Sequence, residues 1–291
     1  MRLVMAIALF LCATPALAQE RPLPDSDPFF EKVKQRLQSD ADRQSPYMYV
    51  ETRREAKPDK NGRPTGESVK VIESYPGLPG EDRWEREIAV DGRPTSARDL
   101  EKQDRERQKY AEEYAKKLAK DPEKIKQSLA RERAREQRAA EEAVAEMFVI
   151  FDVRLIGREA LEGHDTVVIT LTPRRGVKTK TSAGKLMQKF TARAWVSESE
   201  HELVRLEVES IDTVSAGFGL IARLHKGSKG AFQRRKVNGE DWLPASATYT
   251  GSARVGLVKV MRRIGVSEFS GYKKFGVATS STFVPPKPPD R

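Results

Sequence analysis

The sequence predicts a mainly β fold with some α structure: a large curved antiparallel sheet, or half-barrel, of about ten strands, with a short N-terminal helix and a long charged helical insertion. Runs of β-favouring residues with alternating polarity fill the chain before residue 95 and after residue 150, and tight turns join them. Helical patterns interrupt these runs essentially once, which argues against repeated βαβ units. A sheet of this many strands must curl, because strand twist accumulates across it.

Residues 1–18 have the features of a secretory signal peptide. Arg2 is followed by an apolar stretch too short to span a bilayer, and Ala16-Leu17-Ala18 is a small-x-small cleavage site. Cleavage leaves a chain that starts at Gln19, and in a bacterial cell this predicts a periplasmic protein. Leu11, rather than a small residue, precedes Cys12, so lipid anchoring at Cys12 is not expected. Cys12 is the single cysteine, so its removal excludes disulfides and thiolate chemistry.

The chain carries a formal net charge of +10, or +9 without the arginine of the signal peptide. In an exported protein such a charge favours anionic lipid head groups over nucleic acid as the partner. The alternative is that the charge only maintains solubility.

The N-terminal part predicts a short amphipathic helix and then three strands. Asp27 and Pro28 are typical of a helix start, and the apolar spacing that follows predicts a helix over 29–41. The three predicted strands cover residues 47–54, 68–75 and 83–90.

Residues 96–147 predict two solvated helices, at about 97–119 and 122–148. Among these 52 residues, 27 are charged, 13 acidic and 14 basic, and there is no glycine. Ser96 with Asp99, and Asp121 with Pro122, are helix-start signals. Ion pairs four residues apart stabilise such helices. They are interpreted either as a movable lid or arm, or as a solvated insertion with no further role.

From residue 151 onward the pattern is again β. Asn238-Gly239 is the strongest hairpin signal in the chain. The predicted strands cover 151–158, 165–172, 189–197, 201–213, 223–237, 241–255 and 257–271, with a helical turn or a loop at 183–188. The proline-rich tail 285–291 is expected to be disordered, so residues 19–284 are expected to form one domain that contains the 96–148 insertion.

Alternation gives the predicted sheet one apolar and one wet face. The available helices are short or charged, so an apolar trough able to hold acyl chains is one interpretation, and a concave side filled by the protein's own helices is the other. The residues expected to line the trough are Phe190, Val196, Val204, Leu206, Val208, Val167 and Ile169. Lys226, Arg234 and Arg235 are expected either to form a basic rim for head groups or membrane docking, or simply to face water.

The layout resembles that of bacterial periplasmic proteins related to the outer-membrane lipoprotein-sorting (LolA/LolB-like) half-barrels. The segments that carry the resemblance are Tyr47–Glu55, Asp91–Pro94, Phe151–Gly157, Ala222–Ser228 and Asp241–Pro244. The resemblance implies a curved sheet closed by helices around a cavity for lipoprotein acyl chains. It also implies, as an alternative, an envelope-stress sensor or regulatory binding module on the same fold.

Signals for catalysis are weak. The histidines show no metal-ligand spacing, and no cofactor is expected. His225 and Ser228 lie three residues apart without a nucleophile-elbow motif, which leaves a hydrolase as a minor alternative. Trp195 and Trp242 are expected to be packing residues. The function that the sequence predicts is a non-enzymatic periplasmic carrier or chaperone for a lipid or an acylated protein.

Overall fold

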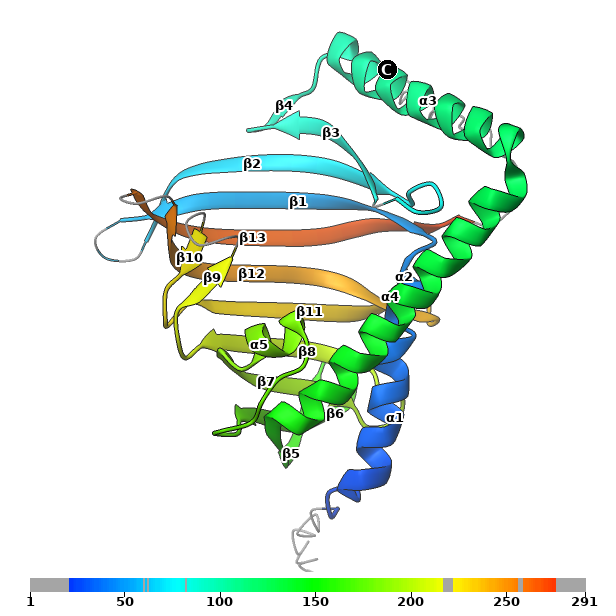
Figure 1. Ribbon diagram of the computed structural model, residues 1–291. Helices are drawn as coiled ribbons and strands as arrows, with labels where there is room; N and C mark the ends of the chain where they lie inside the picture. The colour runs from blue at the N-terminus through cyan, green and yellow to red at the C-terminus, as the bar shows by residue number, and fades with distance from the viewer. Residues whose placement is uncertain are drawn as a thin grey trace, which may run out of the picture.

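The computed structural model describes residues 21–59, 61, 63–81, 83–216, 222–255 and 259–275. The predicted signal peptide, Cys12 and the proline-rich tail lie outside the described residues. The predicted fold class is confirmed: the described part of the chain forms an open, curved antiparallel sheet with five helices (Figure 1). Eleven strands follow one path in the order β4-β3-β2-β1-β13-β12-β11-β8-β7-β6-β5, and β9 and β10 join it through β12.

The elements between residues 26 and 150 largely follow the predicted order. The expected first helix is two helices, α1 and α2, separated at Ser39. The bounds are α1 Ser26–Gln38, α2 Asp40–Gln44, β1 Tyr47–Pro58, β2 Pro64–Tyr75, β3 Trp84–Val90, β4 Arg93–Pro94, α3 Ala97–Lys120 and α4 Pro122–Ile150.

Both charged helices begin at their predicted caps. The Ser96 hydroxyl accepts a hydrogen bond from the Asp99 amide at 3.1 Å, and Asp121 accepts one from the Lys124 amide at 3.0 Å, ahead of Pro122. α3 buries none of its residues, whereas α4 buries Glu146 and Ile150 near its C-terminus. The two helices meet at an open elbow, with α3 beside the β3–β4 edge and α4 running diagonally in front of the sheet (Figure 1).

The remaining elements complete the sheet. Their bounds are β5 Phe151–Leu161, β6 His164–Pro173, α5 Ser182–Met187, β7 Phe190–Ser197, β8 Leu203–Ser210, β9 Val214–Ala216, β10 Ala222–Leu224, β11 Lys229–Val237, β12 Asp241–Val255 and β13 Lys259–Lys274. Asn238 and Gly239 have φ of 53° and 72°, so the predicted hairpin has the primed turn that suits strand twist.

Two predicted strands differ from the structure, one by a break and the other in its length. The 223–237 run divides into β10 and β11, because Gly227 takes a φ of 83° and the Ser228 amide bonds the His225 carbonyl oxygen at 3.3 Å. The 201–213 run is longer than the strand that forms, since β8 covers only Leu203–Ser210 and the separate short β9 begins at Val214.

The core lies between one half of the sheet and the helices. Phe29 and Val33 of α1 and Ile150 of α4 pack with apolar residues of β5, β6 and β7. We call the side of the sheet that carries this core the helix face, and the opposite side the outer face.

Candidate functional site: the helix face of the sheet

The strand register assigns the residues of β7, β8, β11 and β12 to the two faces. Directly opposed residues on neighbouring strands share a face. The core residue Leu171 opposes Ala192, and from Ala192 one row runs through Val208, Gly230 and Tyr249 to Gly265. A second row runs from Ala194 through Leu206, Phe232 and Ala247 to Ser267. These rows carry the apolar helix face beyond the core.

We call the set Ala192, Leu206, Val208, Gly230, Phe232, Ala247 and Tyr249 the apolar strip. Its members are half-buried, apart from Tyr249, which is 43% exposed. In Figure 1, α1, α4 and α5 lie in front of β5–β8, whereas no helix crosses the middle of β11, β12 and β13. The strip therefore begins at the edge of the helical cover and extends over the uncovered part of the sheet.

The predicted trough residues fall into two groups. Val167, Val196 and Ile169 belong to the core, and Val204, at the register shift of β8, is fully buried. The protein's own helices thus fill the trough at β6 and β7. Leu206 and Val208 lie in the apolar strip, and Phe190 is half-buried at the start of β7. The structure brings Leu206 and Val208 together with Phe232 and Tyr249.

Phe232 and Tyr249 were not among the residues predicted from the sequence. Both alternate correctly within their strands, so periodicity could have placed them on the helix face. The cross-strand register, which alternation does not give, is what joins them to Leu206 and Val208.

The strip ends in a polar group on β13 and β1. Glu51 is 6% exposed and accepts hydrogen bonds from Arg53 at 2.7 and 2.9 Å and from the Ser267 hydroxyl at 2.6 Å. Burial by itself raises the pKa of Glu51, but the hydrogen bonds and the Arg53 charge outweigh it, so the pKa is lowered. Next to this group, the Tyr249 hydroxyl donates to Glu55 at 3.0 Å. The helix face thus offers an apolar surface that ends at charged, hydrogen-bonded side chains.

The outer face of the same strands is hollowed but polar. A hollow of about 460 Å³ lies over β7, β8, β11 and β12. Most of its lining belongs to outer-face rows, with charged residues such as Arg193, Glu207 and Lys229 beside threonines. Such a lining does not suit a hydrocarbon chain.

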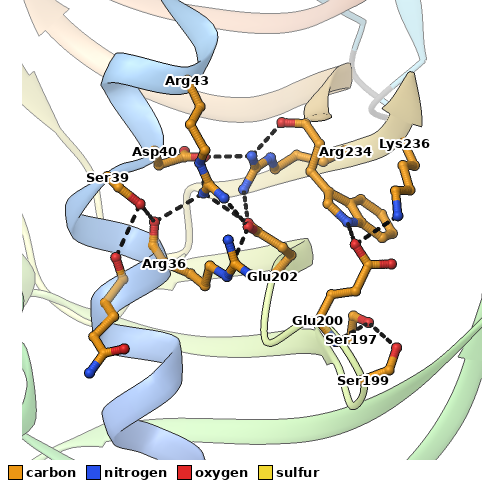
Figure 2. Close-up of polar contacts among 12 residues, drawn as sticks. Arg36, Ser39, Asp40, Arg43, Ser197, Ser199, Glu200, Glu202, Arg234 and Lys236 are labelled. Carbon is orange, nitrogen blue, oxygen red and sulfur yellow. Dashed lines mark hydrogen bonds and ion pairs between the residues drawn. The ribbon is translucent and has the colours of Figure 1, made fainter. Parts of the chain in front are cut away.

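The predicted basic rim does not exist as one surface. Arg234 is 2% exposed and lies between α2, the β7–β8 connection and β12 (Figure 2). It pairs with Asp40 at 2.5 Å, lies 3.6 Å from Glu202 and donates to the Trp242 carbonyl oxygen. Glu202 also pairs with Arg43 and lies 3.6 Å from Arg36. Arg234 is therefore a buried structural charge that fixes α2 to the sheet.

The other two residues of the predicted rim, Arg235 and Lys226, are exposed but lie near opposite ends of β11. Arg235 is exposed and donates to the Phe269 carbonyl oxygen at 3.0 Å. Lys226 is exposed in the turn between β10 and β11, at the opposite end of β11 from Arg235. Trp195 and Trp242 are buried, as expected for packing residues.

The His225–Ser228 pair is a turn contact. The Ser228 hydroxyl donates to the His225 carbonyl oxygen at 2.7 Å rather than to its imidazole, so the turn provides no base for this serine. Among the described residues, no group of three His, Cys, Asp or Glu side chains is placed to hold a metal ion. In the same part of the chain, no helix is long and apolar enough to cross a membrane.

Comparison with known proteins gives similarity of fold only. No protein-family model and no curated protein matches the chain. A LolA superfamily protein from Nitrosomonas europaea is 12% identical, with 85% of this chain and 94% of that chain covered and a TM-score of 0.28. A putative outer membrane lipoprotein-sorting protein domain from Vibrio parahaemolyticus is 10% identical, with 86% and 95% covered and a TM-score of 0.33.

The MucA/MucB complex of Pseudomonas aeruginosa is also similar, at 9% identity, with 86% of this chain and 100% of that chain covered and a TM-score of 0.25. The resemblance predicted from the sequence is thus found again among solved structures, over most of the chain. Identities and TM-scores this low carry no argument about function, so the proposals below rest on the residues of this chain.

Proposed function

We propose that the protein is a non-enzymatic periplasmic carrier or chaperone that holds an acyl chain, from a lipid or an acylated protein, on the apolar strip. The observation that carries the proposal is that the apolar helix face continues across β8, β11 and β12 beyond the helices that cover its other half. A hydrocarbon laid on this surface would release about 0.8 kcal/mol for each methylene removed from water.

The glycine of the strip supports this role. Gly230 lies between Val208 and Tyr249 in the cross-strand row, and a Cβ built on it would lie 3.3 Å from the Val208 side chain. Because glycine has no side chain, the surface of the row is lower at Gly230 than at Val208 and Tyr249 on either side of it. The Glu51–Arg53–Ser267 group at the end of the strip would meet the polar end of a bound lipid.

The periplasmic location is part of the proposal, because residues 1–18 have the pattern of a cleavable signal peptide. One domain over residues 19–284, with α3 and α4 as its insertion, is the corresponding domain organisation.

Binding of a fluorescent fatty acid to the purified protein tests the proposal. We expect Phe232→Asn and Leu206→Asn each to weaken binding several-fold, because each removes apolar area from the strip. Thr248→Asn is the matched control, since Thr248 is exposed on the outer face between two strip residues of the same strand. Equal binding by all three folded variants, or no binding by the wild-type protein, would exclude the strip as the site.

A regulatory binding module is the second candidate, and α3 is the observation that favours it. This helix of 24 residues buries none of them and leaves Tyr110 and Leu118 42% and 37% exposed. Polar contacts hold it to the sheet, among them Arg86 with Asp104 at 2.8 Å and Arg107 with Glu81 at 2.9 Å. If α3 receives a protein partner, Tyr110→Ser with Leu118→Ser should abolish that partner's binding while fatty-acid binding remains.

A further inference from the structure

One continuous stretch of the chain, residues 174–189, is strongly cationic. It contains Arg174, Arg175, Lys178, Lys180, Lys185 and Lys189 and has no acidic residue. It comprises the loop after β6, helix α5 and the two residues before β7. The first five of these cations are exposed, and in the described part of the chain none of the five forms an ion pair.

The loop and α5 are held in a defined position. The Glu146 carboxylate, on α4, accepts hydrogen bonds from the Thr181 amide and hydroxyl and from the Lys180 amide. These hydrogen bonds lower the pKa of Glu146. Met187 and Val177 pack against the core cluster, and the Gln188 side chain donates to the Val177 carbonyl oxygen at 2.7 Å. The cationic segment is thus anchored through its backbone, the polar Thr181 and Gln188 side chains and two apolar side chains, and none of these anchoring contacts is an ion pair of its five exposed cations.

Two exposed apolar side chains lie at the end of the sheet where β7 begins and β8 ends, beside the cationic segment. Leu186 is 48% exposed on α5, next in the sequence to Met187, which packs against the core. Ile211 is 39% exposed, and its amide donates to the Lys189 carbonyl oxygen at 2.8 Å. Lysines therefore flank two protruding hydrocarbon side chains.

The neighbouring β10–β11 turn adds to the positive charge. Gly227 donates to the Ser210 carbonyl oxygen at 2.8 Å, which brings Lys226 to the end of β8. The acidic residues nearby are already engaged: Asp212 pairs with Lys189, and Glu209 lies 3.4 Å from Lys229. Positive charge thus exceeds negative charge across this end of the sheet.

We infer that this surface, formed by residues 174–189 with Ile211 and Lys226, docks the protein on an anionic phospholipid bilayer. Lysine and arginine side chains near a bilayer surface are attracted to anionic head groups, and exposed apolar side chains beside them insert at the level of the acyl boundary. A purely acidic protein partner would explain the cations but not the exposed aliphatic side chains of Leu186 and Ile211. The inference goes beyond the proposed carrier function, because it concerns a different end of the sheet from the polar end of the strip.

Sedimentation with vesicles tests the inference. The purified protein is mixed with vesicles of phosphatidylcholine, with or without about one third phosphatidylglycerol, at low and high salt. We expect binding that requires phosphatidylglycerol and weakens with salt. Lys178→Ala, Lys180→Ala and Lys185→Ala combined should lower the partition coefficient on the order of 100-fold at low salt. Leu186→Ser should lower it about 10-fold.

The design separates charge at this surface from charge in general. Lys180→Ala keeps the backbone amide that Glu146 needs, so the fold is expected to remain. Lys116→Ala, Lys117→Ala and Lys120→Ala, all exposed on α3, form the matched control and should bind as the wild-type protein does. Leu206→Asn, which tests the cargo site, should leave vesicle binding unchanged.

Three results would each overturn the inference. The first is equal binding to vesicles with and without phosphatidylglycerol. The second is an equal loss of vesicle binding in the 178/180/185 variant and in the α3 control. The third is vesicle binding by Leu186→Ser that equals that of the wild-type protein. The last result, with the charge effect present, would show that charge alone holds the protein at the vesicle surface and that Leu186 does not enter the bilayer. Since no fatty acid is needed, loss of the carrier proposal and loss of this inference are separate outcomes.

Discussion

The Glu146 carboxylate of α4 lies directly against Gly184 of α5, so closely that a methyl group on Gly184 would overlap it. Gly184 is buried, and its amide also bonds the Thr181 hydroxyl at 2.9 Å. Because Gly184 has no side chain, the Glu146 carboxylate of α4 can approach α5 this closely. This contact holds α5, a short helix whose other residues are mostly exposed, against α4.

Gly184→Ala should therefore destabilise the protein by about 1–3 kcal/mol, although alanine is the better helix former. Urea unfolding measures the change. Ser182→Ala, at an exposed position of the same helix, is the control and should change stability by less than about 0.5 kcal/mol. A Gly184→Ala protein as stable as the wild type would show that α4 and α5 do not pack as described.

Arg234→Ala should destabilise the protein by about 3 kcal/mol, because Asp40 and the buried Glu202 each lose a cationic partner, although Arg43 remains beside both, and the Trp242 carbonyl oxygen loses its donor. Arg235→Ala, one residue along the same strand but exposed, should cost less than about 1 kcal/mol. Chemical denaturation of the two variants side by side measures the difference. Similar losses in both would contradict the buried position of Arg234.

The Glu198–Arg158 pair predicts a specific pH dependence. Arg158 donates to both Glu198 oxygens, at 2.7 and 2.8 Å, and these bonds hold the pKa of Glu198 below its usual range despite the opposing effect of partial burial. A carboxyl with a lowered folded-state pKa stabilises the fold above its unfolded pKa of about 4.3, and the contribution is lost as the pH falls through the folded value. Stability should therefore fall on acidification below about pH 4.3.

Glu198→Gln isolates this contribution, since glutamine does not titrate. The wild type should be more stable than this variant at neutral pH, and the difference should vanish at low pH. Urea unfolding of both proteins across the acid range measures it. A difference that stays constant with pH would remove the ion pair as the cause.

The Tyr249 ring covers Gly265 on the neighbouring strand, and a Cβ at Gly265 would overlap the ring. Gly265→Ala should cost about 1–3 kcal/mol in the wild-type background. In a Tyr249→Ala background the same change should be nearly neutral, because the overlapping ring is gone. A double-mutant cycle by thermal unfolding measures the coupling, and simple additivity would contradict the contact.

Local signals predicted much of the fold. The Ser96 and Asp121–Pro122 caps placed the starts of α3 and α4, and Asn238-Gly239 placed the β11–β12 hairpin, because caps and tight turns depend on adjacent residues. The break at Gly227 was missed, since a glycine within a β-rich run does not reveal whether its φ is positive.

The candidate site was less accessible to sequence reasoning. Alternation assigned Leu206 and Val196 to the same face, but only packing shows that helices cover Val196 and leave Leu206 at the margin. Arg234 looked like one of several surface cations. Its partner Asp40 lies 194 residues away in the sequence, and a local pattern cannot contain such a pairing.

The eleven-strand path ends at β4 on one side and at β5 on the other, and both of these strands are unsuited to receiving another strand. At one edge, β4 is two residues long and ends in Pro94, which has no amide hydrogen to donate. At the other, the register of β5 shifts between Leu155 and Gly157, and charged Arg154 and Arg158 flank the shift. These features oppose edge-to-edge polymerisation, so the sheet can stay unclosed, with part of its helix face uncovered, without the risk of fibre growth that an open edge usually carries.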